Sequence, residues 1–174
     1  ALKQDDGTVE KAIRDGLIRW HGLPFTTHTE CMTAELFEEG LRLSKALDLR
    51  FGLETHAAKM TDVPGHTVAM LPLLSKYGIR FLHIGVNGAS MPPDVPPLFV
   101  WERENSRVAV AVNAGGYGGQ TVIGDNVFLF AHTLDNLGPQ SPQEIRDVYQ
   151  KAREEYPGAK VRCGTLEDFL DAID

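Results

Sequence analysis

Apolar side chains that recur every three or four residues predict a series of helices along the chain. The fourth begins at Ser141-Pro142-Gln143-Glu144, which has the form of a capping box with proline at the first helical position. Glycines follow the first three helices at positions typical of a helix end. The predicted helices cover residues 8–16, 33–50, about 67–77, 142–156 and the segment that starts at Thr165.

Shorter apolar runs between these segments predict strands. The runs at 79–84 and 127–132 are almost continuously apolar, as in strands that are buried on both faces. The runs at 97–102 and 107–112 are expected to form an antiparallel pair. The other predicted strands cover residues 17–23, 56–60 and 160–163.

The order strand, loop, helix recurs along the chain and predicts an α/β fold with a mainly parallel sheet and crossover helices. With 174 residues the chain is long enough for one such domain, so we expect a single domain over residues 1–174. Ligands of α/β folds bind at the C-terminal ends of the strands. Most candidate functional residues fall in the polar loops expected there, which are 24–32, 61–67, 85–97, 113–120 and 133–140.

Two aspartates each follow a predicted strand and are the main candidates for catalysis. Asp62 comes after strand 56–60, and Asp135 comes after strand 127–132. Two carboxylates at one edge of a sheet are what glycoside hydrolysis needs, one as nucleophile and one as general acid/base. The alternative is that Asp62 or Thr61 caps the next helix and that Asp135 is an ordinary turn residue.

Several other side chains in these loops are candidates for contacts with a sugar. Tyr117 lies between two pairs of glycines, where its ring could serve as a platform for a sugar ring. Near a predicted helix start, His66 could orient Asp62 or bind a metal. A solvated loop is an equally simple explanation for the histidine and glutamate of loop 24–32. The predicted substrate-binding residues are His28, Glu30, His66, Tyr117 and His132.

Charge and composition narrow the classes of partner. The net charge of -7 at pH 7 argues against nucleic acid and against a membrane surface as partners. No apolar run approaches the roughly 20 residues that span a bilayer. The isolated Cys31 and Cys163 are interpreted as buried thiols in a reducing compartment, which favours a cytoplasmic location. Neither a Gly-x-Ser-x-Gly elbow nor a phosphate-binding loop is present, so a serine hydrolase and a nucleotide-binding protein are not supported.

The segment around Asp62 resembles a motif of the family 38 α-mannosidase glycoside hydrolases. Residues 59–67, Lys-Met-Thr-Asp-Val-Pro-Gly-His-Thr, are similar to the family's Asp-x-x-Gly-His-Ser/Thr motif at a strand end. Residues 73–79 and 164–172 are similar to later parts of the catalytic domain, and the chain looks like a distant branch. The resemblance implies a zinc-dependent retaining glycosidase on a partial (β/α) barrel of the glycoside hydrolase/deacetylase type. It also implies that Asp62 is the nucleophile and a zinc ligand, with Asp135 near the position of the acid/base.

The chain departs from that family in its metal ligands. The family takes zinc ligands from a His-x-Asp motif on its first strand and from a distant downstream histidine, and this chain has neither. We therefore expect part of a larger catalytic domain that alone binds zinc weakly and does not turn over sugars. The alternatives are a metal-dependent polysaccharide deacetylase, in which a metal-bound water attacks, and a non-catalytic carbohydrate-binding module of the same fold. Sheet edges left unpaired by a partial barrel make a homo-oligomer possible.

Overall fold

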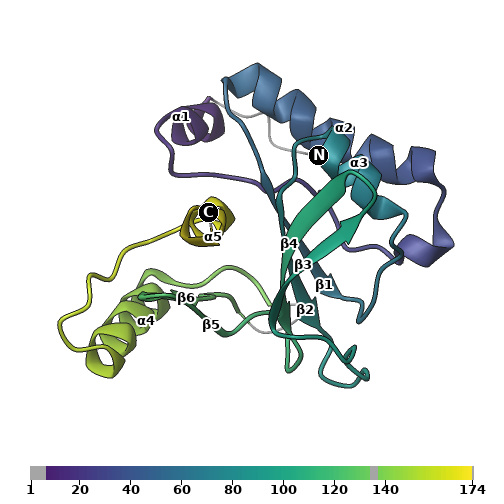
Figure 1. The fold of residues 1–174 in the computed structure, drawn as a ribbon. Helices are drawn as coiled ribbons and strands as arrows, with labels where there is room; N and C mark the ends of the chain where they lie inside the picture. The colour runs from purple at the N-terminus through teal and green to yellow at the C-terminus, as the bar shows by residue number, and fades with distance from the viewer. Residues whose placement is uncertain (1–6, 134–136, 174) are drawn as a thin grey trace.

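A four-stranded sheet forms the centre of the structure, a computed structural model that describes residues 7–133 and 137–173. Its strand order is β1-β2-β4-β3, and Figure 1 shows the sheet at the centre of the fold. Neighbouring strands pair in parallel from β1 to β4, and β3 is antiparallel at one edge. The strands are β1 (Ala57–Asp62), β2 (Phe81–Val86), β3 (Leu98–Arg103) and β4 (Ser106–Asn113). The predicted α/β fold with a mainly parallel sheet is confirmed, and the described strands do not close a barrel.

Two helices, α2 (Ala34–Phe51) and α3 (Met70–Lys76), pack on one face of this sheet. Helix α2 begins at Thr33, whose hydroxyl accepts a hydrogen bond from the Leu36 N–H, and it ends at Gly52 in the left-handed conformation. Helix α3 connects β1 to β2, as expected for a parallel crossover. The core between helices and sheet includes Leu41, Met60, Leu71, Leu74, Leu82 and Ile84.

The opposite face of the sheet is covered by the C-terminal part of the chain. Strands β5 (Gln120–Ile123) and β6 (Asn126–Leu129) form a separate antiparallel hairpin, and α5 (Leu166–Ile173) packs between it and the sheet. Helix α4 (Pro142–Glu155) lies farther out, and α1 (Thr8–Arg14) and the short 3-10 helix η1 (Thr29–Cys31) complete the fold (Figure 1). This face buries Ala57, Phe81, Ala111, Ile123, Phe169 and Leu170.

The strand predicted at residues 17–23 is not formed. The segment runs beside β1, but among the described residues only the N–H of Gly22 bonds to a β1 carbonyl, that of Ala57, at 2.9 Å. Farther along, the Lys59 N–H donates to the His21 side chain at 3.4 Å instead of to a backbone carbonyl. A strand needs a repeated series of backbone hydrogen bonds, and here the His21 side chain accepts the bond that a backbone carbonyl would have to accept.

Two other strand predictions are also wrong. Only Asn126–Leu129 of the run 127–132 is a strand, and it pairs with β5 rather than with the parallel sheet. The reason is a two-residue turn, Gly124-Asp125, with Gly124 in the left-handed conformation, which folds this run back as a hairpin. Residues 160–163 are irregular. The expected burial of the two thiols is also wrong, because Cys31 and Cys163 are both exposed.

Within residues 7–133 and 137–173, no helix combines the length and the apolar character needed to cross a membrane.

Candidate active site at the ends of the parallel strands

Three polar side chains meet where the parallel strands end. Asp62 is the last residue of β1, Asn87 follows β2 directly, and Tyr117 lies in the glycine-rich loop after β4. These strands are neighbours in the sheet, so their C-terminal ends lie side by side. Asp62 has a φ of 78°, which is unusual for a residue other than glycine. The structure thus places Asp62 at the edge where α/β proteins bind ligands.

Asp62, Asn87 and Tyr117 form a closed triangle of hydrogen bonds. The Asn87 amide donates to Asp62 Oδ1 at 2.8 Å and to the Tyr117 hydroxyl oxygen at 3.1 Å. The Tyr117 hydroxyl donates to the same Oδ1 at 2.9 Å. The amide orientation of Asn87 is fixed because its oxygen accepts from the Ala89 N–H at 2.8 Å. Each of these donors therefore has an acceptor within the triangle.

The triangle stabilises the charged form of Asp62. The hydrogen bond from Asn87, followed by that from Tyr117, holds the pKa of the Asp62 carboxyl below its usual range. Partial burial opposes this lowering of the pKa, and the electrostatic interaction with nearby His28 adds to it. Asp62 is partly exposed, so it is an ionised carboxylate within reach of solvent.

Asp62 does not cap the helix that follows it. Helix α3 begins after Ala69, and no side chain caps its first turn. The Asp62 carboxylate instead bonds to Asn87 and Tyr117, which come from other strand ends. The interpretation of Asp62 or Thr61 as a helix cap is therefore wrong. An Asp62 that was buried and hydrogen-bonded only to its own helix would favour a non-catalytic module, and the observed contacts differ from that arrangement.

The loop that carries His28 and Glu30 reaches the same end of the sheet. The Thr26 hydroxyl lies 2.9 Å from that of Thr61 at the end of β1. The Thr29 hydroxyl accepts from the Thr67 N–H at 3.0 Å and lies 3.3 Å from Nδ1 of His66. The structure therefore brings loop 24–32 next to the Asp62 loop, although residues 17–23 before it do not form the predicted strand.

His66 is held neutral in this loop contact. Burial lowers its pKa to about 4, while Glu30 raises it and His28 lowers it. Its Nε2 is buried and has no hydrogen-bond partner among the described residues. His66 bonds to Thr29 rather than to Asp62, so it positions the loop and does not orient the carboxylate directly.

The remaining predicted residues differ in how closely they approach Asp62. Tyr117 contacts Asp62 through its hydroxyl, which donates a hydrogen bond to the carboxylate. His132 is exposed, bonds to the Thr133 carbonyl at 2.6 Å and lies beside Gly118 of the glycine-rich loop. Asp135 lies outside the described residues, so the predicted pairing of the two aspartates stays a prediction.

Sequence reasoning missed Asn87 and Lys59. Asn87 lies at the end of β2, just as Asp62 lies at the end of β1. Its place in the polar loop 85–97 was the signal that could have identified it as a site residue. Lys59 is a charged residue in an otherwise apolar run, and its Nζ lies 2.9 Å from Nδ1 of His83 on the neighbouring strand. His83 lies within β2 and is fully buried.

The described residues do not supply a complete set of metal ligands. No group of three or more His, Cys, Asp and Glu side chains among them is arranged to hold a metal ion. Asp62 Oδ1, moreover, already accepts two hydrogen bonds. A zinc ion on Asp62 therefore stays an expectation from the family resemblance, and we derive no chemical step from it.

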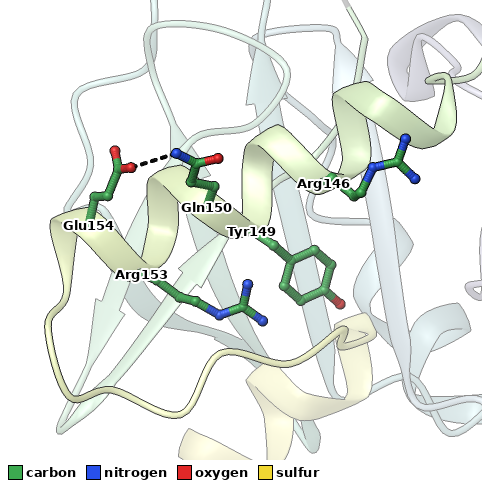
Figure 2. Close-up of a pocket in the computed structure, with 5 residues that line it drawn as sticks. All are labelled: Arg146, Tyr149, Gln150, Arg153 and Glu154. Atoms are coloured by element: carbon green, nitrogen blue, oxygen red, sulfur yellow. Dashed lines mark hydrogen bonds between the residues drawn. The ribbon is translucent and has the colours of Figure 1, made fainter.

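A separate hollow lies beside α4 and does not belong to this site. Its volume is about 620 Å³, and Figure 2 shows its lining side chains, all from α4. Gln150 donates to Glu154 at 2.8 Å, and the Arg153 guanidinium lies 5.5 Å from the centre of the Tyr149 ring. These side chains partner one another along a single helix, and none of them was predicted to be functional.

The chain was also compared with known proteins. No protein-family model matches it, and no curated protein and no solved structure shows significant similarity to it.

Proposed function

We propose that Asp62 is the nucleophile of a retaining, α-mannosidase-like glycoside hydrolase site, built on a partial (β/α) barrel. The observation that supports this proposal is the triangle at the strand ends, in which two donors hold one oxygen of a partly exposed, ionised carboxylate. A glycosidase nucleophile must be charged, oriented and accessible at the same time. The resemblance of residues 59–67 to the α-mannosidase motif supports the same role for Asp62.

In the proposed reaction, Asn87 and Tyr117 hold Oδ1 while Oδ2 attacks the anomeric carbon. A bond forms between Oδ2 and that carbon, and the bond to the leaving oxygen breaks. A general acid must protonate this oxygen, and Asp135 is the residue proposed for it. Water then hydrolyses the glycosyl ester and releases the sugar with its original configuration. Zinc belongs to the proposal only for a protein in which further ligands join Asp62.

The proposal is tested best with a reagent that needs only the nucleophile. A 5-fluoroglycosyl fluoride carries fluoride as its leaving group, which departs without a general acid. Attack by Asp62 should therefore attach one fluorosugar and release one fluoride ion. We expect intact-mass spectrometry to show this adduct with a reagent of α-mannosyl type, and peptide mapping to place it on Asp62. Asp62→Asn should abolish it, whereas Asp94→Asn, a control on the loop after β2, should retain it.

Other outcomes of the same experiment separate the alternatives. A label on another carboxylate, or no label with any fluorosugar at millimolar concentration, would overturn the role of Asp62 as nucleophile. Release of acetate from an acetylated polysaccharide, without any labelling, would favour the deacetylase alternative. Sugar binding without labelling or acetate release would favour a carbohydrate-binding module.

A further inference from the structure

A half-buried lysine and a fully buried histidine lie side by side beneath the glycine-rich loop. Lys59 of β1 and His83 of β2 are partners in the parallel register, and both face the C-terminal half of the chain, where they contact Phe130. Lys59 Nζ lies 2.9 Å from His83 Nδ1 and 4.7 Å from the centre of the Phe130 ring. The Phe130 ring also contacts the His83 ring, at 4.3 Å between ring centres. An apolar ring therefore covers this polar pair.

The proton positions in this cluster follow from the burial of His83. Burial lowers its pKa to about 3, so the ring is neutral at physiological pH. A neutral ring can accept a hydrogen bond at Nδ1 only when its proton is on Nε2. Lys59, whose pKa burial lowers to about 8, is therefore the donor to His83. A second hydrogen bond from the same Nζ goes to the backbone carbonyl oxygen of Tyr117.

The backbone of Tyr117 packs so closely on β2 that position 85 has no room for a side chain. A Cβ on Gly85 would lie 2.5 Å from the Tyr117 carbonyl oxygen and 2.6 Å from its Cα, closer than real Cβ contacts allow. Gly85 lies two residues before Asn87 in the sequence, near the end of the strand that carries His83. The Tyr117 backbone thus rests directly on β2 at Gly85, and Lys59 holds it there from β1.

We propose that Lys59 is a positioning residue that, together with Gly85, fixes the glycine-rich loop so that the Tyr117 hydroxyl remains on Asp62. The chain of contacts runs from Lys59 Nζ to the Tyr117 carbonyl, and from the Tyr117 hydroxyl to Asp62 Oδ1. Lys59 does not touch the reacting atoms in this arrangement. The inference rests on the proposed function only in treating Asp62 as the residue that matters, and its test does not require a sugar.

The test measures the ionisation of Asp62 itself. The side-chain carboxyl carbon of Asp62 is titrated by NMR in the wild type and in Lys59→Met, which keeps the side-chain length and removes the donor. We expect the pKa of Asp62 to rise towards the ordinary value for aspartate, because the Tyr117 hydroxyl is no longer held on Oδ1. Gly85→Ala should act in the same direction by displacing the Tyr117 backbone. Gly88→Ala is the matched control, since a Cβ there meets no atom within 4 Å.

A double-mutant cycle separates positioning from a general loss of structure. In a Tyr117→Phe background the hydroxyl that donates to Asp62 is already absent, so Lys59→Met should leave the pKa of Asp62 unchanged. A merely structural Lys59 would lower the melting temperature without moving this pKa, and that result would overturn the inference. If Lys59→Met does not fold, the same titrations of Lys59→Gln and Gly85→Ala decide the question.

The two proposals can fail separately. If Lys59→Met shifts the pKa of Asp62 but no fluorosugar labels Asp62, the positioning role stands and the glycosidase proposal fails. If Asp62 is labelled but its pKa is the same in wild type, Lys59→Met and Gly85→Ala, the glycosidase proposal stands and the role of Lys59 is wrong.

Discussion

The two faces of the central sheet are built from the same strands but carry different kinds of buried side chain. Towards α2 and α3, strands β1 and β2 present Met60, Leu82 and Ile84, all buried among apolar side chains. Towards the C-terminal half, the alternate positions of these strands include Lys59 and His83. Residues on one strand point alternately to opposite faces, so a single run of sequence supplies both surfaces.

The difference indicates which face stabilises the fold and which positions the site. Apolar burial on the α2 and α3 face stabilises the fold, and the side chains buried there need no hydrogen-bond partner. Lys59 and His83 contribute little net stability, because the cost of desolvating these polar groups offsets most of the free energy of their hydrogen bonds. Their proposed role is to position the glycine-rich loop, through the hydrogen bond from Lys59 to the Tyr117 carbonyl oxygen. Three changes test this division, from the largest expected effect to the smallest.

The largest effect is expected from the apolar face. Leu82→Ala removes a fully buried side chain from the middle of β2 and leaves a cavity, at a cost of about 3 kcal/mol in the free energy of unfolding. Leu49→Ala on α2 is the control, because Leu49 is 80% exposed and its loss should change stability by less than about 0.5 kcal/mol. Urea denaturation measures both. Equal losses for the two variants would contradict the assignment of stability to this face.

An intermediate effect is expected from His83 when the pH falls. The folded pKa of about 3 lies below the ordinary value of 6.5, so in this window the unfolded chain binds the proton and the folded chain does not. Stability is therefore full above about pH 6.5 and decreases as the pH falls towards 3. At pH 5 the contribution of His83 to this loss is about 2 kcal/mol, from 1.36 kcal/mol for each pKa unit.

Urea denaturation at pH 7 and pH 5 measures this loss. His21 and His66, with pKa values of about 4, act in the same direction, whereas Lys59 is protonated in both states below about pH 8 and adds no slope. The His83→Leu variant should lose less stability than the wild type between the two pH values. An identical loss in both proteins would show that His83 is not the group that titrates.

The smallest effect on stability is expected from Lys59→Met. The variant loses hydrogen bonds to His83 and to the Tyr117 carbonyl, but it also removes the cost of burying an amine beneath Phe130. We expect the free energy of unfolding at pH 7 to change by less than about 1 kcal/mol, in contrast to Leu82→Ala. A loss as large as that of Leu82→Ala in the same urea experiment would mean that both faces stabilise the fold alike.

The parts of the fold that sequence reasoning predicted correctly are those with local causes. The helix after Ser141 was predicted from its capping box, and both bonds of the box are present, at 3.3 Å to the Ser141 hydroxyl and 2.7 Å to the Glu144 carboxylate. The antiparallel pair β3–β4 was also predicted and is confirmed. These features depend on residues that are close in sequence, so short-range patterns were sufficient.

The strand predictions that were wrong concern segments whose state depends on a distant partner. Residues 17–23 have the composition of a strand, but His21 takes the Lys59 N–H that a backbone ladder would need. Residues 127–132 look like a buried parallel strand, but the Gly124-Asp125 turn pairs their first part with β5. An apolar run indicates burial, and it does not specify which strand will be its neighbour.

By itself the sequence determined the main helices, the four strands of the central sheet and the position of Asp62 at a strand end. Only the tertiary structure decided what surrounds Asp62. Asn87 and Tyr117 reach it because β1, β2 and β4 are neighbours, and Lys59 lies beneath Tyr117 because the register pairs it with His83. Periodicity and capping act over a few residues and are visible in the sequence. Sheet order and register arise from packing between distant segments, and these bring the residues of the site together.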